Sequence, residues 1–483
     1  MKTYNVVIIG GGVIGAAAAR ELSRYSLSVA LLEKETELAF GVSKSNSGII
    51  HPGTQHSPDS LKGRLCVRGN ELTRRLSREL GFDFKEVGEL IVAFGKEEEA
   101  RLALLIKDAE ALGVPRVSMV DRAWLSEHEP NLNREVTSAV FAATAGIVSP
   151  YRMTYDLGEN AARNGVEIYT QAKVLDIVRL EKGRGPRFEI ITGRGNFGAG
   201  YIINTAGLFA DEVSSMVGVD DFKIRPRKGE EFLLDKKKEN IANHLIFPLP
   251  SKTSKGMLVI KTADGNPMIG PTADDTDDKE DSSTTDDGLN KVLASAKRLI
   301  PSIDGDDIIA YFAGLRPVAG DDFIIRHEDK APGFINAAGM QSPGLTAAPA
   351  VAEAIAGILR SNGLSFKRKL IFHRQRKKTI HLSGMPFSKT KRLIKKDKDY
   401  GDIVCRCEMV SSKEIKDSIK RGAVTLDGIK FRTRAQAGRC HGSFCTTRLL
   451  KILSFETGRP VTEIAKRGWG SELIMGERKN ARA

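Results

Sequence analysis

The stretch Val6-Val-Ile-Ile-Gly10-Gly-Gly12-Val-Ile-Gly15, near the start of the 483-residue chain, decides the fold. Its first residues are apolar and β-branched, as in a parallel strand that is buried on both faces. In this pattern, Gly10 permits a tight turn and Gly12 lets the backbone approach a pyrophosphate. Gly15 allows close packing of the following helix, whose N-terminus faces the phosphates. The stretch therefore predicts a nucleotide-binding turn between a strand and a helix at about 13–25.

An acidic residue at the expected spacing supports this prediction. Ser28–Leu32 is the predicted second strand, and it ends at Glu33, whose carboxylate suits the hydroxyls of a ribose. A second glycine triplet, Gly193-Arg-Gly195-Asn-Phe-Gly198, follows a predicted strand pair and leads into another strand. We interpret that triplet as a hairpin turn. The chain thus has one credible nucleotide site, and the motif leaves open whether its ligand is FAD or NAD.

Composition limits the class of protein. With 483 residues the chain is too long for one core and is expected to hold two or three domains. No apolar run reaches the roughly 18 residues of a membrane span, and the N-terminus lacks the features of a signal peptide. We therefore expect a cytoplasmic protein, in which clustered cysteines are metal ligands more often than disulfides.

The net charge of +13 comes almost entirely from one segment. Residues 366–398 hold 13 Lys and Arg and one acid, Asp397, for a net +12. Two interpretations stay open. The segment is a solvated linker or covering arm, or it binds an anionic partner or the inner face of a membrane as a peripheral contact. Nucleic-acid binding is not expected, because no recognition module accompanies the charge.

Periodicity predicts the other elements in outline. The predicted helices span Leu61–Leu80, Glu97–Leu112, Met153–Asn164 and Ala347–Leu359. Residues 216–330 carry mainly strand signals, and the acidic stretch Asp274–Asp287 within them is predicted to be an exposed loop.

Four of the five cysteines lie in two close pairs, Cys405-Arg-Cys407 and Cys440-His-Gly-Ser-Phe-Cys445. Four thiolates hold either a [2Fe–2S] cluster or zinc. Zinc knuckles favour C-x2-C pairs, so these spacings favour the cluster, with structural zinc and unliganded cysteines as the alternatives. Cys66 stands alone in a predicted helix and is interpreted as a small buried apolar residue.

Beyond these motifs, the chain resembles the D-amino-acid-oxidase superfamily of FAD oxidoreductases. Besides the first fingerprint, the resemblance rests on Ser45-Asn-Ser-Gly48-Ile-Ile-His51, Ile203-Asn-Thr-Ala-Gly207, Ala313-Gly-Leu-Arg-Pro317 and Ala338-Gly339-Met-Gln-Ser-Pro-Gly344-Leu-Thr346. Residues of about 400–470 are similar to the bacterioferritin-associated-ferredoxin-like [2Fe–2S] domain.

This resemblance implies an α/β (α+β) fold. A Rossmann-like FAD-binding domain (about 1–80, 145–215 and 331–365) would carry an inserted mixed-sheet substrate domain (about 81–144 and 216–330). The basic linker at 366–398 and a small iron–sulfur domain at 399–483 would follow.

The resemblance also implies the cofactors, FAD and a [2Fe–2S] cluster, and the residues that hold them. The expected FAD-binding residues are Gly10, Gly12, Gly15, Glu33, Ser45, Asn46, Ser47, Gly48, Ala206, Gly207, Gly339, Gln341, Gly344, Leu345 and Thr346. The expected cluster ligands are Cys405, Cys407, Cys440 and Cys445. A helix N-terminus after Gly339 would stabilise the negative charge that builds on a reduced flavin.

Oxidation of an H–C–O(H) or H–C–N(H) carbon also needs a substrate anchor and a proton acceptor. Arg316 is the expected anchor, because its guanidinium suits a carboxylate or phosphate, and Arg326 is a candidate second anchor. His51, as a residue type that titrates near neutrality, and Glu231, whose pKa burial would raise, are the two candidate acceptors.

Within the superfamily, the whole chain most resembles FAD-dependent glycerol-3-phosphate dehydrogenases that carry this C-terminal domain. The resemblance implies oxidation of glycerol 3-phosphate to dihydroxyacetone phosphate by hydride transfer to FAD. Electrons would pass through the cluster to a second flavoprotein in a hetero-oligomer. The alternatives are an L-2-hydroxy-acid dehydrogenase, since the central region is similar to L-2-hydroxyglutarate dehydrogenases, an amino- or imino-acid dehydrogenase subunit, and a non-catalytic electron-transfer subunit.

Overall fold

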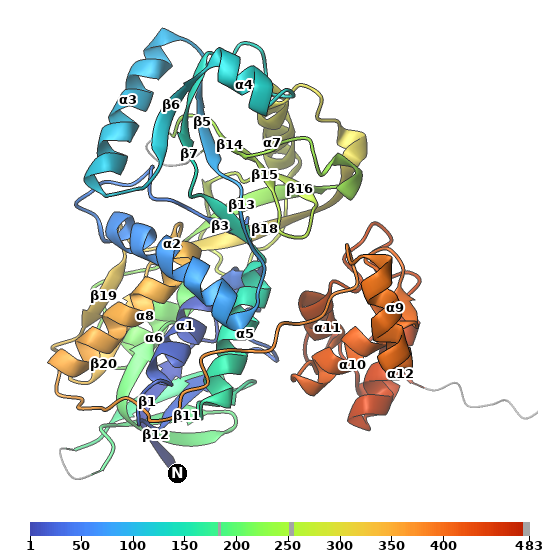
Figure 1. The fold of residues 1–483 in the computed structure, drawn as a ribbon. Helices are drawn as coiled ribbons and strands as arrows, with labels where there is room; N and C mark the ends of the chain where they lie inside the picture. The colour runs from blue at the N-terminus through green and yellow to red at the C-terminus, as the bar shows by residue number, and fades with distance from the viewer. Residues whose placement is uncertain (182–184, 251–255, 477–483) are drawn as a thin grey trace, which may run out of the picture. The chain divides into compact units, whose positions relative to one another are not determined.

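The computed structural model describes residues 1–181, 185–250 and 256–476, which form two compact units (Figure 1). The first unit comprises Met1–Lys34 and Ala39–Arg376, and the second comprises Glu35–Leu38 and the chain from Lys377 onward. Within the described ranges, no helix combines the length and the apolar character that crossing a bilayer requires.

The first unit is built on an eight-stranded sheet that starts with the N-terminal strand. β1 (Lys2–Ile9) pairs in parallel with β2 (Val29–Leu32) and with β12 (Gly195–Asn204). The remaining strands are β9 (Glu167–Tyr169), β10 (Val174–Arg179), β11 (Phe188–Thr192), β19 (Ile324–His327) and β20 (Phe334–Ala338). Because β9, β2, β1, β12 and β20 all run in parallel, their carboxyl ends meet at one edge, where ligands of such sheets bind.

Helices cover this sheet and bring distant segments together. They are α1 (Val13–Leu22), α2 (Leu61–Leu80), α5 (Pro150–Arg163), α6 (Ala210–Ser215) and α8 (Gly344–Ser361). α1 packs against α5 and α8, and α2 packs against α8. A Cβ on Gly69 of α2 would lie 2.1 Å from the carbonyl oxygen of Thr346, so α2 needs a glycine to approach the start of α8 so closely.

A mixed nine-stranded sheet forms the rest of the first unit. Its strands are β5 (Glu89–Ala93), β6 (Val117–Asp121), β7 (Ser138–Ala142), β13 (Arg225–Leu234), β14 (Leu245–Phe247), β15 (Leu258–Lys261), β16 (Pro267–Gly270), β17 (Asp274–Asp275) and β18 (Ile308–Val318). Helices α3 (Lys96–Ala111), α4 (Arg122–His128) and α7 (Asp286–Leu299) accompany it, and β3 (Ile49–Ile50), β8 (Gly146–Val148) and β4 (Phe84–Glu86) form a small third sheet. The long antiparallel pair β13–β18 carries Glu231 and Arg316.

The second unit is mainly helical around a small core. Its elements are α9 (Phe387–Lys396), β21 (Ile403–Cys405), β22 (Val410–Ser411), α10 (Ser412–Lys420), α11 (Leu426–Thr433) and α12 (Thr446–Thr457). Ile415, Leu426 and Leu449 are buried at its centre. Ser411 and Glu414 form a capping box that fixes the start of α10.

The expected fold class and the βαβ unit are confirmed. The predicted hairpin turn is also present: Gly193 and Arg194 connect β11 to β12, and Gly195–Gly198 form the start of β12. The strand-rich interpretation of 216–330 missed α7, because its first residues belong to the acidic stretch predicted to be a loop. Thr285 caps this helix and Asp286 and Asp287 occupy its first turn, where acids are favourable. The basic segment is divided: residues 366–376 lie in the first unit, and the remainder lies in the second.

Candidate active site and cluster site

The nucleotide turn lies between β1 and α1, and two of its glycines, Gly10 and Gly15, are sterically required. Gly10 has a φ of +108°, and a Cβ there would lie 2.4 Å from the carbonyl oxygen of Thr205. A Cβ on Gly15 would lie 2.0 Å from the carbonyl oxygen of Gly10. Gly12 is the N-cap of α1 and makes no such backbone contact. The turn therefore keeps its backbone exposed to a ligand at the start of α1.

Glu33 lies beside this turn, directly after β2. Its side chain is buried, and one carboxylate oxygen accepts a hydrogen bond of 2.6 Å from the Gly11 N–H. Ala206 and Gly207 follow β12 at the same edge, and a Cβ on Gly10 would lie 3.0 Å from the Ala206 Cα. These residues are brought together as the nucleotide-site prediction requires.

The segment from Ser45 to Gly48 forms a second tight turn. The Asn46 Oδ1 accepts a 3.0 Å hydrogen bond from the Gly48 N–H, and the Asn46 Nδ2 donates to the Ser43 carbonyl. Gly48 has a φ of +69°, and a Cβ there would lie 2.4 Å from a backbone oxygen. Ser45 lies against β18, because a Cβ on Gly314 would lie 2.2 Å from the Ser45 carbonyl oxygen. The nine-stranded sheet, to which β18 belongs, thus meets the nucleotide-binding part at this turn.

The late glycine turn follows β20 and leads into α8. Gly339 has a φ of +68°, and its carbonyl accepts from the Gln341 N–H at 2.8 Å. The Gln341 carbonyl in turn accepts from the Gly344 N–H, which starts α8. Leu345 and Thr346 occupy the first turn of this helix, and the Thr346 Oγ1 accepts a 3.0 Å hydrogen bond from the His51 N–H. This contact joins the late turn to the segment after β3.

His51 is buried between two polar groups. Its Nδ1 lies 3.9 Å from a carboxylate oxygen of Glu89, and its Nε2 lies 3.5 Å from the Ser342 Oγ in the late glycine turn. Glu89 is fully buried at the start of β5, and its other oxygen accepts a hydrogen bond from the Thr54 hydroxyl. A carboxylate on the Nδ1 side favours a proton there, which leaves Nε2 as the basic atom toward the late turn.

Glu231 and Arg316 form the second polar group of the site. Glu231 is buried and accepts a 2.6 Å hydrogen bond from the Ser47 hydroxyl. Burial raises the pKa of Glu231, while the Ser47 hydrogen bond and the charge of Arg316 oppose the rise. Burial lowers the pKa of Arg316, and Glu231 opposes that shift. The Arg316 guanidinium also donates to the Thr272 carbonyl at 3.2 Å.

Arg326 is not part of this group. It lies on β19 with 45% of its side chain exposed, and it forms ion pairs with Asp221 and Glu328. The exposed Asp221 and the buried Glu328 both compensate its charge. The structure does not bring Arg326 together with Glu231 and Arg316, and its role as a second anchor stays a prediction.

Sequence reasoning also missed residues around His51. Glu89, Thr54 and Ser342 were not singled out, although each makes or supports a polar contact to His51. A signal existed for Glu89. It is the first residue of the otherwise apolar run Glu89-Leu-Ile-Val-Ala93, so it places a carboxylate at the start of a buried strand. No comparable pattern marks Thr54.

The four clustered cysteines of the second unit lie in two sulfur pairs. The Sγ atoms of Cys407 and Cys440 are 3.6 Å apart. The Cys445 thiol hydrogen-bonds the Cys405 sulfur, which lowers the pKa of Cys405 to about 6. Two sulfurs on one tetrahedral metal, at about 2.3 Å from it, lie roughly 3.8 Å apart. A pair at 3.6 Å therefore fits two ligands of one iron.

The loops hold these sulfurs closely. A Cβ on Gly438 would lie 2.4 Å from the Cys407 Cβ, so the second loop approaches the first only with glycine there. In the described part of the chain, no three His, Cys, Asp or Glu side chains are grouped around a position for a single ion. Two separate pairs fit a two-iron cluster better than one zinc ion with four ligands.

Comparison with known proteins agrees with this geometry. Residues 5–358 match the family model for FAD dependent oxidoreductases, and residues 403–454 match the BFD-like [2Fe-2S] binding domain. The chain belongs to the FAD dependent oxidoreductase family. This oxidoreductase is 40% identical over 480 residues, 99% of each chain, to a protein named glycerol 3-phosphate dehydrogenase from Caloramator mitchellensis.

Two further relatives cover a smaller share of this oxidoreductase. The structure of L-alpha-glycerophosphate oxidase from Mycoplasma pneumoniae with FAD bound matches with a TM-score of 0.73 and 32% identity, over 78% of this chain and 98% of that one. The mitochondrial L-2-hydroxyglutarate dehydrogenase of Caenorhabditis elegans is 34% identical over 56% of this chain and 64% of its own length.

The cofactors of the oxidoreductase are FAD and a [2Fe–2S] cluster. The residues present fit both groups. The glycine turn leaves backbone at the start of α1 for a pyrophosphate, with Glu33 beside it. The Cys407 and Cys440 sulfurs have the spacing of two ligands of one iron, and Cys405 and Cys445 form a second sulfur pair.

Proposed function

We propose that this oxidoreductase oxidises glycerol 3-phosphate to dihydroxyacetone phosphate. The observation that carries the proposal is the 40% identity to a glycerol 3-phosphate dehydrogenase over 99% of both chains, because it covers the oxidoreductase part and the cluster domain together. When bound, the flavin accepts a hydride from the carbinol carbon and the cluster passes electrons singly.

His51 takes the hydroxyl proton of the substrate in this proposal. Removal of a hydride from carbon and a proton from oxygen leaves the ketone, so the site needs one base beside the flavin-facing turn. The His51 Nε2 faces that turn at Ser342, and Glu89 stabilises the imidazolium that forms. Glu231 is less suited to this role, because its carboxylate is already engaged by Ser47 and faces Arg316.

Arg316 binds the phosphate in this proposal. Its guanidinium donates hydrogen bonds in a planar fork that matches phosphate oxygens. Because burial raises the pKa of Glu231, this neighbour has a larger protonated fraction than an exposed glutamate at the same pH. The protonated form leaves the positive charge of Arg316 available to an anionic substrate.

The cluster domain suggests a protein acceptor for the electrons. The match to the L-alpha-glycerophosphate oxidase structure includes 98% of that chain but only 78% of this one. The remaining share includes the cluster domain at 403–454, which an enzyme that reduces oxygen directly does not need. We infer a second flavoprotein subunit as the acceptor, in a hetero-oligomer.

Anaerobic reduction of the bound flavin tests the substrate. Addition of glycerol 3-phosphate should bleach the flavin absorbance, while L-2-hydroxyglutarate, proline and glycine should not. Bleaching by one of these other compounds alone would assign the site to that substrate. Absence of bleaching by all four, in protein that dithionite reduces, would support a non-catalytic electron-transfer subunit.

A further inference from the structure

Residues 366–376, called the strap below, extend the chain beyond α8 and lie in the first unit. Their backbone pairs with the loop after α1: the Lys367 carbonyl accepts from the Ser26 N–H at 2.9 Å, and the Lys369 N–H donates to the Arg24 carbonyl at 2.8 Å. The strap is therefore attached to the nucleotide-binding part and is not a free linker.

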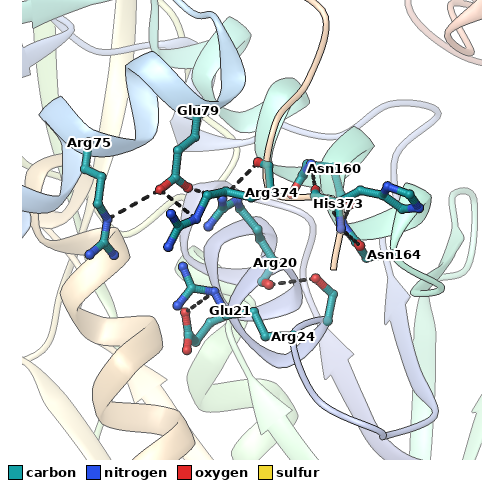
Figure 2. Close-up of polar contacts among 10 residues, drawn as sticks. Arg20, Glu21, Arg24, Arg75, Glu79, Asn160, Asn164, His373 and Arg374 are labelled. Carbon is teal, nitrogen blue, oxygen red and sulfur yellow. Dashed lines mark hydrogen bonds and ion pairs between the residues drawn. The ribbon is translucent and has the colours of Figure 1, made fainter. Parts of the chain in front are cut away.

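Side chains of two helices fix the second half of the strap (Figure 2). The His373 N–H donates to the Asn164 Oδ1 at 2.8 Å, and the Asn160 Nδ2 donates to the His373 carbonyl at 2.9 Å. The Glu79 carboxylate lies 3.4 Å from the Arg374 Nε and forms a buried ion pair with Arg20 at 2.5 Å. The backbone on both sides of residues 370 and 371 is thus held in place.

Between these attachments, two adjacent aliphatic side chains point into solvent. Leu370 is fully exposed and 73% of Ile371 is exposed. The next residue, Phe372, turns inward instead, with its ring 5.8 Å from the Arg20 guanidinium and 5.6 Å from that of Arg24. Two neighbouring exposed aliphatic residues on a fixed backbone mark an interaction site more strongly than one does.

Two positively charged side chains, Lys367 and Arg368, lie shortly before this aliphatic pair in the chain. Lys367 and Arg368 are exposed, and among the residues that the structure describes neither forms an ion pair with an acid. Two acids that contact the strap are already engaged, since Glu79 pairs with Arg20 and Glu159 pairs with Arg376. The strap itself contains no acid. Its surface therefore combines apolar side chains with uncompensated cations.

We propose that the strap binds the surface of an anionic lipid bilayer. Leu370 and Ile371 enter the interfacial region, and Lys367 and Arg368 contact the lipid phosphates. The exposed apolar side chains of the strap are aliphatic, and aliphatic side chains next to Lys and Arg suit a lipid interface.

The second unit repeats this combination independently. α9 carries five Lys and Arg and no acid in its sequence Phe-Ser-Lys-Thr-Lys-Arg-Leu-Ile-Lys-Lys, and the side chain of Phe387 at its start is 80% exposed. A basic helix with an exposed aromatic residue is typical of membrane surfaces. Each unit thus has one exposed basic surface with apolar side chains, the strap in the first unit and α9 in the second. Both surfaces lie within residues 366–398, which supply nearly all of the net charge.

Co-sedimentation of the full-length protein with vesicles tests the proposal without reference to the substrate. Vesicles of phosphatidylcholine mixed with phosphatidylglycerol should bind the protein, and pure phosphatidylcholine vesicles should not. The variant pair Leu370→Ser with Ile371→Ser, and separately Lys367→Glu with Arg368→Glu, should each weaken binding by at least about tenfold. The matched control is Lys173→Glu with Leu175→Ser, an exposed pair on and beside β10, which should bind as the wild type does.

Flavin content and glycerol 3-phosphate bleaching, measured on every variant, separate this proposal from the proposed function. Equal binding to both vesicle types, or unchanged binding of both strap variants, would overturn the lipid assignment. Binding to soluble poly-glutamate but to neither vesicle type would also overturn it, in favour of an acidic protein surface.

Discussion

The active site of the first unit and the sulfur site of the second are assembled in different ways. His51, Glu89 and Ser342 come from three segments that span almost 300 residues of sequence, and they meet only through the packing of two sheets and α8. The four cysteines come from two short loops of a small helical unit. Local spacing therefore predicts the sulfur site, whereas contacts between distant segments determine the active site.

The largest expected effect separates the two units. Replacement of Cys407 and Cys440 by serine should reduce bound iron to background, because it removes both protein thiolates from one iron of the cluster. FAD content and substrate bleaching should persist, since the first unit uses neither residue. Cys66→Ser is the control, because this buried thiol contacts the His51 carbonyl instead. Iron loss in the Cys66 variant, or FAD loss in the double variant, would contradict the separation.

Substitution of His51 tests the active site alone. His51→Gln keeps a polar side chain but removes the base, so kcat for glycerol 3-phosphate should fall by about 10² to 10⁴. Glu89→Gln should lower kcat less than His51→Gln does. It should also shift the acidic limb of the pH–rate profile, because Glu89 orients the imidazole and stabilises its protonated form. Stopped-flow flavin reduction measures both. A His51 variant with wild-type kcat would move the base elsewhere.

Arg316 should affect binding more selectively. Arg316→Ala should lower kcat/KM by about 10- to 100-fold, the range expected for loss of a charge-assisted hydrogen bond. Arg316→Lys should recover part of the loss, because it restores the charge without the planar fork. Arg326→Ala is the matched control and should stay near the wild-type value, since its partners are Asp221 and Glu328. The reverse ranking of Arg316 and Arg326 would refute the assignment.

The smallest effect concerns Glu231 and pH. Burial raises the pKa of Glu231. Its protonated form therefore favours the folded state at low pH, and this contribution to the free energy of unfolding is lost as the pH rises through the folded-state pKa. Glu231→Gln does not ionise, so its Tm relative to the wild type should rise between acidic and mildly alkaline pH by roughly 2 °C or more. The exposed Glu110→Gln variant is the calorimetric control. Parallel Tm curves for wild type and Glu231→Gln would contradict the raised pKa.

The same contrast explains how much could be predicted from sequence. Gly10, Gly12, Gly15 and Glu33 follow a local strand–turn–helix spacing, so this part of the fold could be predicted from sequence, while their contacts to the nucleotide stay a prediction. Arg316 and Arg326 look alike in sequence, and only their packing separates a residue facing Glu231 from one paired at the surface. Glu89 begins a buried strand, but its approach to Thr54 and His51 joins segments 35 or more residues apart, so this contact could not be assigned from sequence.

The account depends on reducing equivalents reaching the cluster from the flavin of the same chain. Anaerobic titration of the holoprotein with glycerol 3-phosphate, followed by visible absorbance and electron paramagnetic resonance, tests this directly. We predict flavin bleaching together with the signal of a reduced [2Fe–2S] cluster. A bleached flavin beside a cluster that only dithionite reduces would contradict the account.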